Sequence, residues 1–284
     1  MNIPKIWKRA AGDVTGRLGP MRVVAWGWSQ TDGAEAERAA RAKLERISAR
    51  IADGLDLPSG YDYGERPLRE EILREIGSAD DDGAMVVTRN AYGALILNTA
   101  RVMFIDVDGA TESVSSPSSW LGRWFSKSAP SGEDADPLAR LRTRLERASD
   151  SSFRIYRTAA GFRLLATERL FVPGGDESEG IMKAVDADPA FVRLCRMQKS
   201  FRARLSPKPW RCDAPRPPAG FPREGDDDDR RHAAWLASYE ARADEHATCR
   251  FVASTGRGRV HEAVQPILDL HDESTRASST LPLA

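Results

Sequence analysis

Apolar positions recur at helical spacing in three segments of the chain, and each segment begins at an aspartate. The longest stripe, 36–51, repeats every three or four residues, as expected of a helix packed by one face. Asp32 precedes it as an N-cap, with Glu35 three positions later at capping-box spacing. Asp136-Pro137 and Asp188-Pro189 begin the other two with an N-cap and a proline, an order favoured at helix starts. These patterns predict helices from residues 32, 136 and 188.

Short apolar runs predict the strands. We expect strands at residues 21–26, 85–88, 95–97, 102–105, 153–158, 162–167 and 201–205. The runs at 95–97 and 102–105 are apolar at consecutive positions, which indicates strands buried on both faces. Ala159-Ala160-Gly161 separates two of the runs and predicts a hairpin between them.

The remaining segments carry weaker patterns. We expect a leading loop over 1–20, a short helix over 68–76, and a glycine-rich loop over 174–180 with a helix from 181. The C-terminal part is expected to be mainly helical, with helices at 230–246 and 261–270 and a short strand at 251–252.

The order of these elements predicts an α+β fold. From 102 to 205 it reads β-α-β-β-α-β, which is the ferredoxin-like order. We therefore divide the chain into three parts. Residues 1–83 form an extension with a strand and an amphipathic helix, 84–216 the ferredoxin-like core, and 217–284 a helical region. Residues 111–135, rich in Ser, Pro and Gly, are expected to be a mobile insertion in the core.

Composition indicates the cellular compartment but says little about the function. The 284 residues are 41% hydrophobic and 30% charged with zero formal net charge, typical of a folded protein with a charged surface. Three scattered cysteines do not make a disulfide framework, so we expect a cytoplasmic, bacterial type of protein. Residues 1–21 lack the apolar core of a signal peptide, and no stretch reaches about 18 apolar residues, so no membrane partner is expected.

The most informative motif is Phe104-Ile105-Asp106-Val107-Asp108-Gly109. Residues two apart on a strand point to the same face, so Asp106 and Asp108 are expected to project together from the end of a buried strand. Paired carboxylates are natural ligands for Mg²⁺ or Mn²⁺. The alternative is a strand that ends in an Asp-Gly turn without chemistry.

An Asp-x-Asp at the end of the first strand of a ferredoxin-like unit resembles the palm of archaeo-eukaryotic-type primases and primase-polymerases. The resemblance implies metal binding by Asp106 and Asp108, and nucleotide contacts from the hairpin 156–163. The family's hairpin usually presents a histidine after the glycine, whereas this chain has Arg163 there. Asp186 and Asp188 are the candidates for a third carboxylate, although Asp188 is also explained as an N-cap.

Basic residues concentrate between 189 and 216, where eight Lys and Arg face one Asp, a net charge of +7. Residues of this kind bind phosphates, and an interleaved aromatic such as Trp210 can stack on a base. The expected phosphate contacts are Arg154, Arg157, Arg163, Arg204, Lys208 and Arg211. The alternative is a solvated helix face followed by an edge strand that its charges protect from aggregation.

His246-x-x-Cys249 is half of a zinc site that Cys195, Cys212 or His232 would have to complete; ordinary packing is the alternative.

Together, the Asp-x-Asp motif and the basic segment predict a protein that binds a nucleotide or single-stranded nucleic acid. Mg²⁺- or Mn²⁺-dependent nucleotidyl transfer of the primase type at Asp106 and Asp108 is the corresponding activity. The other reading is a scaffold or protein-interaction protein without catalysis.

Overall fold

The computed structural model describes residues 1–17, 19–55, 67–78, 81–108 and 136–284. Its described strands form three antiparallel sheets, with helices around them, so the fold is mixed α+β. No helix within these ranges is long and apolar enough to cross a membrane. The predicted insertion at 111–135 lies outside the described residues.

The first four-stranded sheet carries the Asp-x-Asp motif. It contains β6 (Phe104–Asp108), β7 (Phe153–Thr158), β8 (Gly161–Ala166) and β10 (Cys249–Thr255), in the order β10-β7-β8-β6. The helix α2 (Pro137–Ala148) lies between β6 and β7 in the chain, and β8 separates these two strands in the sheet. The predicted hairpin of β7 and β8 is confirmed. β10, from the region expected to be mainly helical, supplies an edge strand to this sheet.

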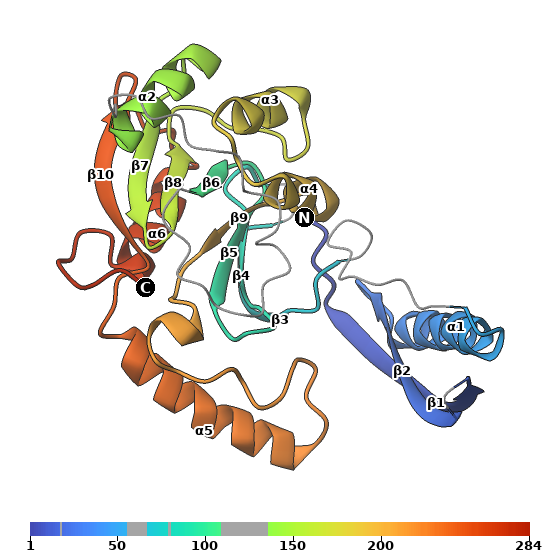
Figure 1. Cartoon of the computed structure of the whole chain (residues 1–284). Helices are drawn as coiled ribbons and strands as arrows, with labels where there is room; N and C mark the ends of the chain where they lie inside the picture. The colour runs from blue at the N-terminus through green and yellow to red at the C-terminus, as the bar shows by residue number, and fades with distance from the viewer. Residues whose placement is uncertain (18, 56–66, 79–80, 109–135) are drawn as a thin grey trace.

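The second four-stranded sheet lies beside the first. Its strands are β3 (Glu71–Ile76), β4 (Met85–Arg89), β5 (Leu95–Thr99) and β9 (Phe201–Arg204), in the order β3-β4-β5-β9. β9, expected as the last strand of the core, forms its ladder with β5 and lies next to β6 (Figure 1). The two sheets therefore meet along β6 and β9.

Buried side chains cover both faces of the first sheet, which explains its consecutive apolar positions. Ile105, Ile155 and Leu164 share one core with residues of α2, α3 (Asp176–Ala184) and α4 (Pro189–Gln198). On the other face, Phe104 and Leu165 pack with α6 (Gln265–Thr275) and with residues of the second sheet. Because successive strand residues alternate between faces, two cores are built from one strand sequence.

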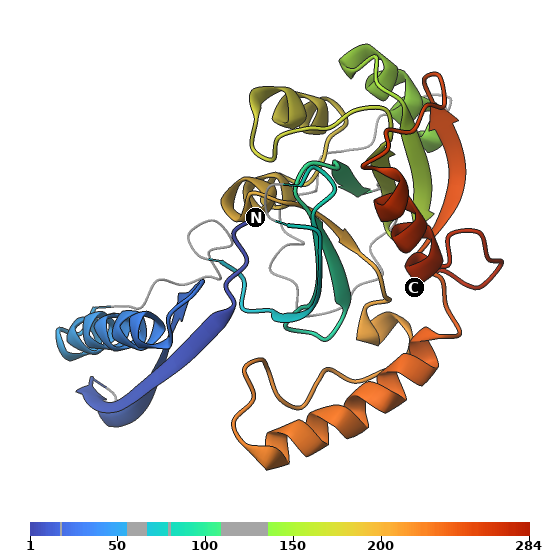
Figure 2. The same cartoon turned by 180° about the vertical axis from the view of Figure 1, so that it is seen from behind.

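The N-terminal part forms an arm that projects from the two sheets (Figures 1 and 2). Its strands β1 (Ile6–Gly16) and β2 (Gly19–Ser29) pair as a long hairpin packed on α1 (Gly33–Ala52). A β-carbon on Gly27 would lie 2.2 Å from the backbone oxygen of Ala36, so the helix needs a glycine there. The predicted leading loop over 1–20 is wrong, because β1 occupies most of it.

Four other elements differ from the predictions in type or in boundaries. The expected helix over 68–76 is the strand β3, whose backbone pairs with β4. The expected loop over 174–180 is mostly α3, which begins at Asp176. The two C-terminal helices are shifted: α5 spans Asp226–Ala243 and α6 begins at Gln265. Both α3 and α5 begin with acidic residues, which favour the positive end of a helix dipole.

The outer edge of β10 is closed by the C-terminal residues. The backbone N–H of Phe251 donates to the carbonyl of Ala277 at 2.9 Å, and the N–H of Ala284 donates to Ala247 at 3.1 Å. The Arg250 guanidinium donates to the carbonyls of Ser279 and Leu281. These contacts leave the edge strand little capacity to pair with another chain.

Candidate functional site

Asp106 is bound on both carboxylate oxygens by Arg163, which lies directly opposite it where β6 pairs with β8. The Nε of Arg163 donates to Oδ1 at 2.7 Å, and Nη2 donates to Oδ2 at 3.0 Å. The remaining Nη1 donates to the backbone carbonyl of Arg204 in β9 at 2.7 Å. The Arg163 side chain is 1% exposed. This fork therefore joins the two sheets and takes up both oxygens of Asp106.

The charge of Arg163 governs the ionisation of Asp106. Burial by itself would disfavour the carboxylate, but the Arg163 charge and its hydrogen bonds hold the pKa of Asp106 below its usual value. Burial alone would lower the pKa of Arg163, but the charge of Asp106 and its hydrogen bonds raise it. Both groups are thus ionised, and each satisfies the other.

Asp108 lies at the exposed end of β6 among other carboxylates. Partial loss of hydration, together with the charges of Asp188 and Asp106, raises the pKa of Asp108. Asp188 also caps α4, since its Oδ1 accepts from the N–H of Ala190 at 2.9 Å. Asp186, the other candidate for a third carboxylate, pairs instead with Arg144. Asp188 therefore combines a cap with an electrostatic contribution at Asp108.

Three basic side chains gather near the two aspartates of β6, because β9 lies beside this strand. Burial, together with the charges of Arg204 and Arg211, lowers the pKa of Lys208 to about 8, against a weaker opposing effect of Asp108. Burial and the charge of Arg163 lower the pKa of Arg204. The Nε of Arg204 is buried and has no hydrogen-bond partner in the described part of the chain. We call Arg204, Lys208 and Arg211 the cationic cluster.

Within the described ranges, no carboxylate forms an ion pair with the cationic cluster. Other basic residues of the same segment are neutralised. Arg202 is buried against Glu70 at 2.7 Å, and Arg196 is paired with Glu179. The basic residues of segment 189–216 are therefore of two kinds. Arg196 and Arg202 form ion pairs, whereas the cationic cluster has no ion pair with a described carboxylate.

Trp210 stands at the edge of the cationic cluster and is 47% exposed. The ring of Tyr92 meets it edge-on at a centroid distance of 5.3 Å, and Lys208 lies 5.6 Å from the Trp210 ring centre. Tyr92 was not among the predicted site residues. It sits in the turn between β4 and β5, where Gly93 approaches Trp235 so closely that a β-carbon would lie 2.0 Å from the ring. No local pattern in the sequence links this turn to Trp210.

Two predicted phosphate contacts lie away from the cationic cluster. Arg154 donates to Asp272 at 2.9 Å and to the Tyr156 hydroxyl at 2.9 Å. Arg157 projects from the opposite face of β7 and lies 4.8 Å from the ring centre of Phe162. The structure thus brings together Asp106, Asp108, Arg163, Arg204, Lys208, Trp210 and Arg211, and it places Arg154 and Arg157 elsewhere.

The carboxylates at the end of β6 do not fit a two-metal centre. Such a centre places two cations at the carboxylate oxygens, whereas Arg163 donates to both oxygens of Asp106 and already places a buried positive charge there, which repels a metal ion. Asp108 is the β6 carboxylate that is open to a cation. No group of three or more His, Cys, Asp or Glu residues suited to a metal occurs in the parts of the chain that the structure describes.

The three cysteines do not come together as the zinc site considered above would require. Cys195, Cys212 and Cys249 are buried in three different hydrophobic clusters. Burial raises the pKa of Cys249, and its Sγ lies 3.9 Å from Nε2 of the buried His271. These contacts are those of packed core residues.

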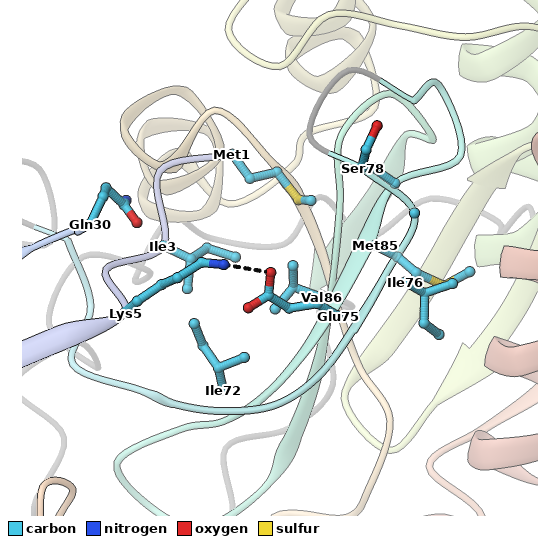
Figure 3. Close-up of a pocket in the computed structure, with 12 residues that line it drawn as sticks. Met1, Ile3, Lys5, Gln30, Ile72, Glu75, Ile76, Ser78, Met85 and Val86 are labelled. Carbon is cyan, nitrogen blue, oxygen red and sulfur yellow. Dashed lines mark hydrogen bonds and ion pairs between the residues drawn. The ribbon is translucent and has the colours of Figure 1, made fainter.

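A cavity of about 190 Å³ lies elsewhere, between the N-terminal segment and the strands β3 and β4 (Figure 3). Its wall is largely apolar, with Ile3, Ile72 and Met85 among its residues, and the Lys5–Glu75 ion pair crosses it at 2.7 Å. None of the predicted site residues lines it, so it adds no chemistry to the site.

Comparison with the models of known protein families, with curated proteins and with solved structures finds no match to this chain.

Proposed function

We propose that this protein binds the phosphates of a nucleotide or of single-stranded nucleic acid at the cationic cluster. The observation that carries the proposal is the convergence of Arg204, Lys208 and Arg211 with no ion-paired carboxylate in the described residues. Partly desolvated like charges repel one another and disfavour their own protonation. A bound anion removes both penalties, and phosphate oxygens match arginine donors in geometry.

Trp210 favours a nucleotide or a nucleic-acid strand over free phosphate. Tyr92 meets its exposed ring edge-on, and Lys208 and Arg216 lie over the ring at 5.6 and 5.5 Å from its centre. An aromatic face beside a cationic groove binds a base by stacking while the cations hold its phosphate. Because every base has such a face, this arrangement favours binding without strong sequence preference.

The experiment is a titration of the full chain with inorganic triphosphate and with a dT oligonucleotide of about 12 nucleotides, followed by tryptophan fluorescence and thermal unfolding. The variant Lys208→Met removes one member of the cluster. Its matched control is Lys183→Met on the exposed face of α3. We expect both ligands to raise the melting temperature of the wild type and of the control, and to have a weaker effect on Lys208→Met. No binding by the wild type would leave the scaffold or protein-interaction alternative.

The arrangement of elements supports a relation to primase-like palms as part of this proposal. β6, α2, β7 and β8 have the connectivity of a ferredoxin-like unit, in which β9 would be the remaining strand beside β6.

The three free, buried cysteines fit a reducing compartment, so we propose that the protein is cytoplasmic.

The second candidate function is phosphoryl or nucleotidyl transfer with Mg²⁺ or Mn²⁺ at Asp106 and Asp108. The crowding of Asp108 with Asp188 and Asp106 favours it, since a cation would relieve this repulsion. In this proposal Asp108 would hold the ion and Asp106 would act through its charge. A calorimetric titration with Mn²⁺, on the wild type and on Asp108→Asn, tests it: binding that is lost in the variant would support this function, and no binding by the wild type would contradict it.

A further inference from the structure

The position of Arg163 bears on whether phosphate binding at this site needs a metal ion at Asp106. We infer that the Arg163 guanidinium takes the place of a metal ion at Asp106, so that phosphate binding at the cationic cluster does not require a metal. This inference rests on the proposed phosphate-binding function and specifies how the site achieves it.

The first argument is geometric. Arg163 donates to Oδ1 and Oδ2 of Asp106 at 2.7 and 3.0 Å, so it spans the carboxylate. A divalent ion at the same oxygens would lie close to a guanidinium that cannot lose its proton. Charge repulsion then opposes metal entry for as long as Arg163 stays in place.

The second argument is that Arg163 has no alternative position. Its side chain is 1% exposed, and its third donor group binds the carbonyl of Arg204 at 2.7 Å. Moving it would break three hydrogen bonds and leave a buried charge without a partner, which is strongly unfavourable. Arg163 is therefore a fixed part of the site rather than a mobile side chain that a metal displaces.

The third argument concerns what the metal would have done. In phosphoryl-transfer sites, metal ions neutralise phosphate charge. Here the carbonyl that Arg163 binds belongs to Arg204, whose own guanidinium is a member of the cationic cluster. Arg163 thus fixes the backbone from which the phosphate-binding cations project. It is a positioning residue, and the cluster supplies the neutralising charge.

The test compares the affinity of the wild-type chain for inorganic triphosphate in EDTA and in excess Mg²⁺. We expect binding in EDTA to be as tight as in Mg²⁺ or tighter, within about threefold if the Mg²⁺ complex also binds. Binding that appears only with Mg²⁺ would overturn this inference and leave the proposed function standing. No binding in either buffer would overturn the proposed function, and the inference with it.

Calorimetry with Mn²⁺ alone completes the design. We expect no ion at Asp106, so any saturable Mn²⁺ binding by the wild type below about 1 mM, the range of weak protein sites for divalent ions, should persist in Asp106→Asn. Saturable Mn²⁺ binding that disappears in Asp106→Asn would contradict the inference directly, because it would place the ion on the carboxylate that Arg163 occupies.

Discussion

Asp106 contributes to stability chiefly as the partner of a buried arginine. The substitution Asp106→Asn leaves Arg163 charged and buried with a weaker acceptor. We expect a loss of about 2–3 kcal/mol in urea unfolding, less than for a fully buried pair because the Asp106 side chain is 37% exposed. The control is Glu37→Gln, which breaks an exposed pair with Arg41 and is expected to cost far less, because solvent screens exposed ion pairs. Equal losses would contradict a buried role for Arg163.

Titration of Lys208 is expected to change stability and triphosphate affinity in opposite directions as pH rises. Its pKa falls from 10.5 to about 8 in the folded protein. The folded state therefore loses its proton first, so the stability of the free protein is expected to rise as pH increases from about 8 to about 10.5. Triphosphate affinity is expected to fall over pH 7–9, because neutral Lys208 no longer attracts phosphate.

The matched variant for this prediction is Lys208→Arg, which stays charged throughout this range. We expect its affinity for triphosphate to be flat from pH 7 to pH 9, measured by tryptophan fluorescence. An unchanged pH dependence in Lys208→Arg would assign the titration to another group.

The individual site residues were easier to predict than their neighbours. Asp106 and Asp108 follow from the period of two along a strand, and the basic segment follows from composition. The partner of Asp106 depends on the register between β6 and β8, which places Arg163 opposite it. The approach of Lys208 to Asp108 depends on β9 lying beside β6, and no local pattern encodes that long-range packing.

At the scale of elements, the arm depends on close contact between a helix and a strand. Gly27→Ala would place a methyl group 2.2 Å from backbone atoms of α1, so hairpin and helix must separate. We expect a loss of about 2–3 kcal/mol, at the upper end for overpacking, by thermal or urea unfolding.

Gly180→Ala is the control for this substitution. No residue that the structure describes lies within 4 Å of the added β-carbon in α3. The substitution is therefore expected to be neutral, or to stabilise by up to about 1 kcal/mol through the greater helix propensity of alanine. A tolerated Gly27→Ala would mean that α1 does not pack on the hairpin as described.

The same contact explains why β1 was missed. Its inward positions include the small residues Ala10, Gly12 and Gly16, and a β-carbon on Gly16 would lie 2.8 Å from the Ile51 side chain of α1. The usual alternation of a strand is therefore absent from its sequence. β3 was predicted as a helix, and its pairing with β4, which is distant from any local signal, makes it a strand. The helices capped by Asp32, Asp136 and Asp188 were predicted because their signals are local.

At the scale of the whole molecule, the formal net charge is zero, so attraction of nucleic acid is expected to depend on the cationic cluster. With no overall attraction for nucleic acid, binding of a dT oligonucleotide should depend on the three cations of the cluster. We expect the logarithm of affinity to fall with the logarithm of salt concentration with a slope of about −2, corresponding to three phosphate contacts.

Lys208→Met should reduce the magnitude of that slope by about 0.7, since one contact is lost. Fluorescence titrations at several salt concentrations measure both values. A slope near zero would exclude phosphate contacts, whereas a much steeper slope would require basic residues outside the cluster.

The pairing of strands also determines when the molecule can fold during synthesis. β5 pairs with β9, for example Ile96 with Arg204, and β7 pairs with β10, for example Arg157 with Arg250. Each sheet is thus completed by a strand made about a hundred residues after its neighbour. Such distant pairings slow folding and prolong the exposure of unpaired strand edges. A nascent chain that ends before residue 201 still exposes the edge of β5, so the ribosome-bound intermediate is expected to need protection from aggregation until β9 emerges.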